Sequence, residues 1–262
     1  MIRIVNMTIG TSDPTTMETP VRRVSEKVGA EIDIYNFNSV LVESDPMAFD
    51  DLCRRSIDAD LVIVRCVTDP DRFSKMERFC NVLSECKGFV YVHSSDTGVR
   101  AERRYLFKGT DEEFTLLGAF VGNRGDANDE GIAYWLMNRL GMDVSVPEPV
   151  CQRPHGIYHP DFDTNVGFDE YMSCLDMSKP VVGILITGSQ WIYGDLDHID
   201  MLIRKLESAG MSTIPVFFNA GSNGGKNRMS DVYERYFMKD GRSLVRVIIT
   251  NNPFSQLANS RN

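Results

Sequence analysis

The chain has 262 residues, of which 42% are hydrophobic and 25% charged, as expected of a folded protein with one or two domains. Its 37 acidic residues exceed its 28 basic ones, and the net charge at pH 7 is −9. An acidic surface repels phosphate backbones and anionic lipids, so neither nucleic acid nor a membrane is an expected partner. No apolar run approaches the length of a membrane span, and the opening MIRIVNMTIG has a strand pattern instead of a signal peptide.

The six cysteines do not suggest a disulfide framework or a metal site, because none of them forms a Cys-x-x-Cys pair. Cys53, Cys66, Cys80 and Cys86 fall within apolar patterns, where cysteine behaves as a small buried hydrophobe. We therefore expect a cytoplasmic protein with reduced thiols.

The first half of the chain alternates between strand and helix patterns. Apolar or period-two runs predict strands over 3–7, 31–37, 60–66 and 88–94. Apolar residues at helical spacing predict helices over 17–28, 45–57, 73–83 and 132–140. Gly29 and Gly141 stand where two of these helices would stop, and Pro46 suits the first turn of another. Strand–helix units in series predict a parallel sheet with helices on both faces, in a flavodoxin-like or similar order.

Residues 143–178 break this rhythm with four prolines and no clear period, which is typical of a connector. A second series follows, with strands predicted over 181–187, 211–218 and 244–250 and helices over 196–209 and 232–238. A three-stranded parallel sheet with so few helices would leave an apolar face uncovered. The predicted fold class is α/β, with two Rossmann or flavodoxin-like parallel-sheet lobes. Domain 1–142 is joined by the Pro-rich connector 143–178 to an incomplete second domain, 179–262.

The stretch CQRPHGIYHPDF, residues 151–162, places His155 and His159 four residues apart. Pro154, Gly156 and Pro160 rule out a regular helix, so this spacing does not put both imidazoles on one helical face. A metal site needs three or more ligands, and only two are visible here. We therefore expect Tyr158 and the two histidines to pin the connector to both domains by packing and hydrogen bonds.

Two polar loops precede predicted helices in the first half. TIGTSDPTT, residues 8–16, resembles in composition a flavin-phosphate loop, but Asp13 and Glu18 bring negative charge and no glycine-rich phosphate motif is present. Local turn and cap preferences account for its hydroxyl residues. In GNRGDANDEG, residues 122–131, an aspartate or asparagine could cap the next helix, or Arg124 could form an anion- or partner-binding turn. Composition leaves these two interpretations open.

The segment TGSQWIYGDLDHID, residues 187–200, follows a predicted parallel strand, where open α/β sheets place their ligands. Trp191 and Tyr193 offer flat surfaces to a flat ligand, whereas Asp195 could instead cap the next helix and His198 could lie on its surface. No spacing here supports a Ser-His-Asp or Cys-His catalytic set.

The succession of three segments resembles one protein family. GNRGDANDEGIAYWLMNRLG, then HGIYHPDF, then KPVVGILITGSQWIYGDLDHIDMLIRKLESAGMSTIPVFF is similar to the large subunit of ATP-dependent metal chelatases. This family comprises CobN of cobaltochelatase and its large-subunit relative in magnesium chelatase. The likeness covers most of the chain from about residue 88 onward. Gly188, Ser189 and Gln190 depart from the more charged set that the family has after this strand.

The resemblance implies the N-terminal portion of a large subunit that binds a tetrapyrrole and inserts cobalt or magnesium. ATP would be hydrolysed by separate AAA+ subunits, so the complete complex would use the metal and ATP while this portion binds no cofactor directly. A tetrapyrrole or corrin substrate and the AAA+ subunits are thus the expected partners, and this chain alone is not expected to be catalytic. The residues assigned to tetrapyrrole or partner binding are His155, Tyr158, His159, Gln190, Trp191 and Asp195. The alternatives are a standalone tetrapyrrole-binding module and a flavodoxin-like FMN-binding module built on residues 8–16.

Overall fold

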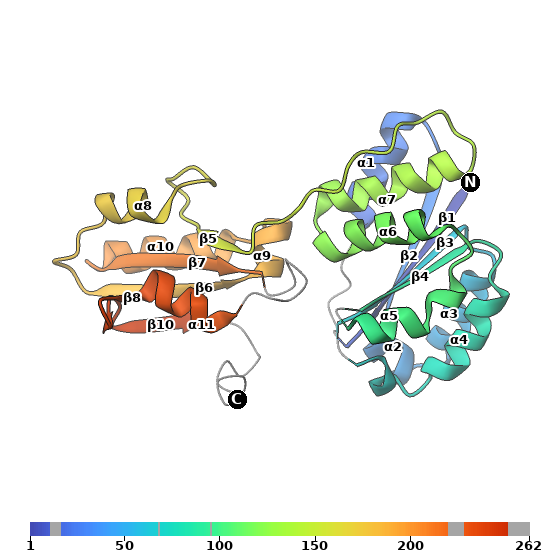
Figure 1. Cartoon of the computed structure of the whole chain (residues 1–262), viewed down its shortest axis with the longest axis horizontal. Helices are drawn as coiled ribbons and strands as arrows, with labels where there is room; N and C mark the ends of the chain where they lie inside the picture. Colours follow the sequence, from blue (N-terminus) through green and yellow to red (C-terminus); the bar gives the residue numbers. More distant parts are fainter. Residues whose placement is uncertain (11–16, 68, 95, 220–227, 251–262) are drawn as a thin grey trace. The chain divides into compact units, whose positions relative to one another are not determined.

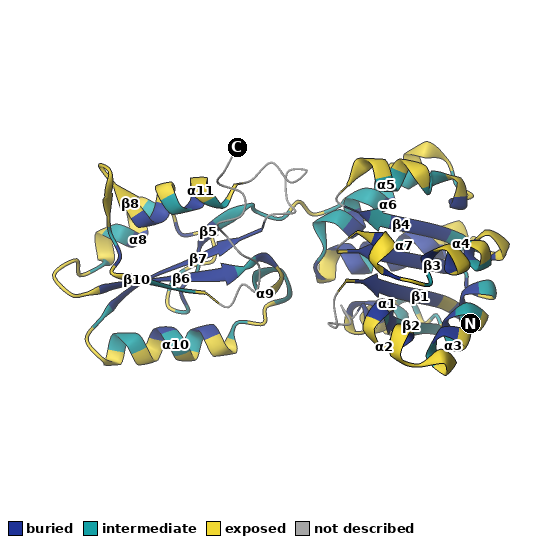
Figure 2. Cartoon of the chain, turned by 90° about the horizontal axis from the view of Figure 1, so that it is seen from below, coloured by how far each residue is buried: buried dark blue, intermediate teal, exposed yellow. Residues whose placement is uncertain are grey.

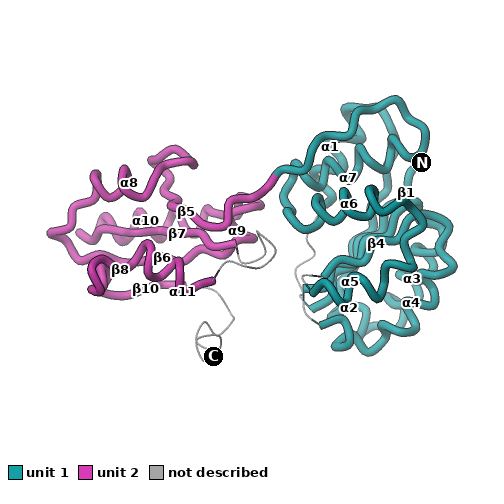
Figure 3. Tube along the Cα trace, in the orientation of Figure 1, with its two compact units in different colours: residues 1–150 teal, residues 151–262 magenta. Residues whose placement is uncertain are grey.

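The structure, a computed structural model, describes residues 1–10, 17–67, 69–94, 96–219 and 228–250 (Figure 1). The chain forms two compact units, Met1–Val150 and Cys151–Asn262 (Figure 3). The fold is mixed α/β, with a four-stranded parallel sheet in the first unit and a four-stranded mixed sheet in the second. None of the helices in the described ranges is long and apolar enough to cross a membrane.

The sheet of the first unit has the strand order β2-β1-β3-β4. The strands are β1 (Ile2–Ile9), β2 (Ile32–Asn38), β3 (Leu61–Cys66) and β4 (Phe89–Ser94). All neighbours run parallel, and every residue of β3 is buried, as expected of a strand covered on both faces. Successive side chains of each strand enter two separate apolar clusters, one on each face of the sheet.

Helices cover both faces of this sheet, and Figure 2 shows their exposed outer sides above buried strands. One face packs against α2 (Ser39–Ser44), α3 (Pro46–Ile57) and α4 (Met76–Glu85). The other packs against α1 (Glu18–Val28), α6 (Asp111–Asn123) and α7 (Asp126–Arg139). Gly29 ends α1 in the left-handed conformation, as the sequence predicts. The Asp45 carboxylate accepts the first-turn N–H of Met47 in α3.

The polar stretch after β4 contains helices that the sequence analysis did not predict. These are α5 (Thr97–Glu102), the 3₁₀ turn Arg104–Leu106 and α6. Helix α6 begins with a capping box between Thr110 and Glu113, in which each side chain binds the backbone N–H of the other residue. A second 3₁₀ turn, Pro70–Arg72, precedes α4.

The sheet of the second unit has the order β10-β6-β7-β5. Strands β6 (Val181–Thr187), β7 (Ser212–Phe218) and β10 (Val247–Thr250) run parallel, as predicted. Of the predicted connector, 143–178, the residues from Cys151 onward are grouped with this unit. They contribute β5 (His155–Ile157), which runs antiparallel to β7, and α8 (Phe168–Cys174). The sheet is mixed because β5 pairs antiparallel with the edge of β7, whereas the other three strands are parallel.

Both faces of the second sheet are also covered within the described ranges, contrary to the expectation of a bare face. Helices α9 (Gly188–Tyr193) and α10 (Asp197–Ser208) pack on one face. The opposite face packs against α8, α11 (Met229–Val232) and the π-helical turn Tyr233–Phe237. The hairpin of β8 (Met238–Lys239) and β9 (Arg242–Ser243) leads to β10, where Val247 is 51% exposed.

Candidate functional site

His155 lies at the start of β5 and contacts the helical layer on one face of the second sheet. Its Nδ1 is 2.8 Å from the hydroxyl oxygen of Tyr236, and the two rings meet edge to face. Pairing of β5 with β7 continues beyond the strand on both sides, because Asn219 donates to Pro154 and Tyr158 donates to Pro215. His155 therefore lies in extended backbone, whereas His159 lies in the loop after β5, and the two imidazoles have different partners.

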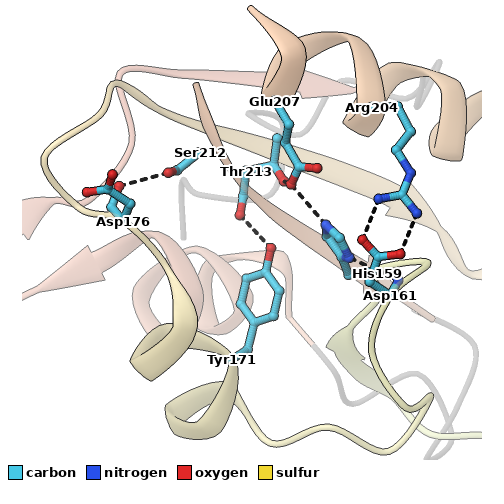
Figure 4. A network of polar contacts seen from close by, with 8 residues as sticks. All are labelled: His159, Asp161, Tyr171, Asp176, Arg204, Glu207, Ser212 and Thr213. Carbon is cyan, nitrogen blue, oxygen red and sulfur yellow. Dashed lines mark hydrogen bonds and ion pairs between the residues drawn. The ribbon is translucent and has the colours of Figure 1, made fainter. Parts of the chain in front are cut away.

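His159 is buried and holds a defined tautomer. The backbone N–H of Asp161 donates to its Nδ1 at 3.1 Å, so the proton must reside on Nε2. Nε2 then donates to the Glu207 carboxylate at 2.9 Å (Figure 4). Because Glu207 also accepts from the Thr213 hydroxyl, this imidazole joins the connector to both α10 and β7.

Three residues of α10 together hold the loop that follows β5. Asp200, Arg204 and Glu207 have the spacing i, i+4 and i+7, which places them on one helical face. Asp200 accepts from the Tyr158 hydroxyl at 2.6 Å, and Arg204 makes a two-pronged ion pair with Asp161 (Figure 4). Burial, and then this bond to Asp200, raises the pKa of Tyr158, while Arg204 lowers the pKa of Asp161. These contacts of Tyr158 and His159 lie within the second unit.

Gln190 lies at the carboxyl end of β6, in the first turn of α9. Its Oε1 accepts from the backbone N–H and the hydroxyl of Thr187, so its Nε2 is the group that faces His198 Nε2 at 2.7 Å. His198 Nε2 must then accept, which leaves the proton on Nδ1, 3.9 Å from Asp195. Asp195 does not cap α10: the cap position is Leu196, and the Asp195 side chain is 75% exposed.

Trp191 forms an aromatic stack with Phe217 of β7. The two ring centroids are 4.0 Å apart and the planes differ by 3°. The Arg153 guanidinium is 5.4 Å from the Trp191 centroid and 5.0 Å from that of Phe217, so it lies beside the pair and not over one outer face. Tyr158 meets Trp191 edge to face at 5.9 Å. The structure thus brings Tyr158, Trp191 and Gln190 to one face of the sheet, whereas His155 contacts the cluster on the other.

This arrangement offers binding groups and no nucleophile–base pair. Aromatic rings, a guanidinium and an amide–imidazole–carboxylate chain can hold a flat polar ligand by stacking and hydrogen bonds. In the part of the chain that the structure describes, no three His, Cys, Asp or Glu side chains gather as a metal-binding group. All six cysteines are free thiols, and Cys151 and Cys174 are exposed.

The turn GNRGDANDEG contains a buried ion pair that the sequence analysis did not predict. Asp129 accepts from Arg65 of β3 at 2.7 Å, and the two side chains are only 1% and 6% exposed. Burial raises the pKa of Asp129, and Arg65 opposes that rise. Asn128 accepts from the N–H of Val150 and donates to its carbonyl. Neither residue caps α7, whose cap position is Gly125, because both side chains make tertiary contacts instead. The sequence signal for this ion pair was Arg65, a charged residue within the otherwise apolar strand β3.

Together these features define an α/β protein of two units with a candidate binding site at the carboxyl end of the second sheet. Residues 118–262, more than half of the chain, match the model of the CobN/magnesium chelatase family, and the chain belongs to this family. The resemblance found in the sequence is thereby confirmed.

Two similar proteins are much longer than this chain. An uncharacterized protein of Methanocaldococcus jannaschii is 28% identical over 145 residues, which are 52% of this chain and 12% of that protein. Among solved structures, the catalytic subunit of cobaltochelatase from Mycobacterium tuberculosis matches with a TM-score of 0.48 and 12% identity, over 83% of this chain and 16% of that one. The chain thus spans less than a fifth of either protein.

Proposed function

We propose that this chain is a portion of a CobN-like large subunit of an ATP-dependent metal chelatase, which inserts cobalt or magnesium into a tetrapyrrole in the cytoplasm. This portion would help to bind the tetrapyrrole or the AAA+ partner subunits and would not insert metal by itself. The observation that carries the proposal is the family match over residues 118–262, which includes all of the second unit.

Within the second unit, the six predicted residues divide into two roles. Gln190, Trp191 and Asp195 would face the ligand or partner, because they follow a parallel strand and include an exposed carboxylate beside a partly exposed indole. His155, Tyr158 and His159 would act by position. Their contacts fix β5 and its loop against β7 and α10, which keeps Tyr158 and Arg153 beside Trp191.

An absorbance titration tests the tetrapyrrole part of this proposal. We expect a water-soluble porphyrin to show a saturable shift of its Soret band with the full chain, and Asp195→Asn together with Gln190→Ala to weaken that shift. Asp169→Asn is the matched control, since it removes the same charge from an exposed carboxylate at the start of α8.

A second experiment tests partner binding by passing the AAA+ subunits over the immobilised chain with and without ATP. Retention by the wild type but not by the Asp195 and Gln190 variant would support a partner-binding role. If neither the porphyrin nor the AAA+ subunits bind, the proposal is wrong. Quenching of added FMN fluorescence would instead support the flavodoxin-like alternative, whose loop at 11–16 lies outside the described residues.

A further inference from the structure

A row of polar side chains crosses the first sheet near the carboxyl ends of its strands. Thr8 of β1 pairs in register with Asn38 on one side and Arg65 on the other, and Arg65 pairs with His93 of β4. Paired residues of parallel strands point to the same face. The strand residues that alternate with the row, such as Met7 and Val64, enter the cluster under α3 and α4, so the row faces α1, α6 and α7.

The row lies at the topological switch point of the sheet. From β1 the chain crosses through α1 to β2, on one side of β1, whereas from β3 it crosses through α4 to β4, on the other side. Helix α1 covers one face and α4 the opposite face. Open α/β sheets bind their ligands in the crevice that such a divergence leaves outside the carboxyl ends of the strands. Thr8 and Arg65 stand at this point.

Two polar atoms of the row are buried and make no hydrogen bond with any residue that the structure describes. They are the hydroxyl oxygen of Thr8, a residue with 1% exposure, and the Nδ1 of His93. A buried hydroxyl without a hydrogen-bond partner destabilises the fold, so folded proteins rarely retain one without a role. A hydroxyl can donate a hydrogen bond to an anion, as can a neutral imidazole in the appropriate tautomer.

Positive charge converges on the same place. The pKa of His93 is lowered to about 4, mainly by burial and also by the charges of Arg65, Arg100 and Arg124. Arg124 also acts on Asp129, and Arg100 acts on Tyr91, one layer below His93. Of these three arginines, Arg65 pairs with the buried carboxylate of Asp129. Arg100 makes no ion pair with a carboxylate that the structure describes. Three guanidinium groups thus act on the same edge of the sheet.

Arg124 is further distinguished by its backbone. Its φ of 58° is in the left-handed region, which a β-carbon makes unfavourable, between the end of α6 and Gly125. Strain of this kind persists where the surrounding structure fixes it. Here it places the residue at the junction of α6 and α7.

From these observations we propose that the carboxyl edge of the first sheet binds the oxyanion of a small ligand, a carboxylate or a phosphate, through Arg100, Arg124, Thr8 and His93. The guanidinium groups supply the charge and the fork-shaped donors that suit such oxygens, and Thr8 and His93 supply neutral hydrogen bonds. This site lies in the first unit and does not depend on the proposed function of the second.

The test uses His93 as a reporter, because the chain has only 4 histidines. Imidazole ¹H–¹⁵N spectra of the full chain are recorded while inorganic phosphate or succinate replaces chloride at constant ionic strength, and His93→Gln identifies the His93 signals. We expect the chemical shifts of His93 to change saturably at millimolar concentrations of one of the two anions. The signals of the exposed His198 should not change. The anion that acts distinguishes phosphate from carboxylate.

Variants then test the named groups. Arg100→Gln should weaken anion binding by about fivefold or more, whereas Arg54→Gln, an exposed arginine of α3 with the same charge change, should leave it unchanged. Thr8→Val should weaken binding by roughly threefold while the unfolding midpoint stays equal or rises, since it removes a hydroxyl that lacks a partner. A purely structural hydroxyl would give the opposite result, a lower midpoint.

Two outcomes would overturn the proposal. The first is that His93 responds to neither anion in the wild-type chain. The second is that Arg100→Gln and Arg54→Gln have equal effects on anion binding.

Discussion

Removal of the Asp129 carboxylate should destabilise the first unit more than most single substitutions. The perturbation is Asp129→Leu, which leaves the Arg65 guanidinium buried without its carboxylate. Both side chains are almost fully enclosed, at 1% and 6% exposure, and their 2.7 Å contact is screened little by water. The matched surface case is Arg23→Met, which removes exposed pairs with Asp126 and Glu130 and should change stability little.

The magnitude follows from the cost of a buried charge without its partner. Breaking a buried ion pair from one side costs about 3–5 kcal/mol, against a total stability of about 5–15 kcal/mol for a domain. For a unit of this size that loss lowers the melting temperature by roughly 10 °C. The double substitution Arg65→Met with Asp129→Leu removes both charges together and should recover most of the loss.

The 2 tryptophans make the assay specific to one unit, because Trp135 lies in the first and Trp191 in the second. In a Trp191→Phe background, urea unfolding followed by fluorescence reports on Trp135, which is 3% exposed in the wild type. A loss below about 1 kcal/mol for Asp129→Leu, or a double variant no more stable than the single one, would refute this reasoning.

Three further predictions use the same assay. Tyr158→Phe removes the bond to Asp200 and should cost about 1 kcal/mol in the second unit, read from Trp191 in a Trp135→Phe background. Tyr105→Phe, at an exposed site of the first unit and read from Trp135, should cost nothing; equal effects would contradict the pinning role. Gly88→Ala would put a β-carbon 2.2 Å from the Asp60 carbonyl oxygen and should cost about 2 kcal/mol or more of stability. The control is Gly167→Ala, whose β-carbon meets no atom within 4 Å. If Gly88→Ala does not lower stability, the backbone can shift at this position. The pKa of His93 falls from 6.5 to about 4 on folding, so the unfolded chain binds more protons and stability is lost as pH falls below 6.5. Between pH 7.5 and 5 this loss should be about 2 kcal/mol and should disappear in His93→Gln; an unchanged pH profile would refute a depressed pKa.

The elements predicted correctly are the strands and helices whose buried residues recur at a regular spacing along the sequence. Strands β3 and β6 read as continuous apolar runs because both faces of their sheets are covered. Gly29 and Gly141 follow their helices with positive φ, as their positions indicated. In these segments the local conformational preference and the pattern of buried residues both indicate the same element.

The elements missed depend on distant contacts. Strand β5 has three residues, one of them glycine, so it has no periodicity, and its identity comes from pairing with β7. The predicted caps of α7 fail because Asn128 and Asp129 bind Val150 and Arg65. Among the candidate site residues, the side-chain types of His155, Tyr158 and His159 suggested hydrogen bonding, but only the fold assigns Tyr236, Asp200 and Glu207 as their partners.

The antiparallel pairing of β5 affects the order in which the second unit can form during synthesis. Residue 157 pairs with residue 216, so β5 leaves the ribosome before β6 but has no partner until β7 has followed. Closing such a distant contact is entropically slow. We expect the nascent segment around Gly156 to remain open to proteases and chaperones until translation passes Phe218. Ribosome-bound chains that end before β7 should therefore be cleaved there, and chains that extend past it should be protected.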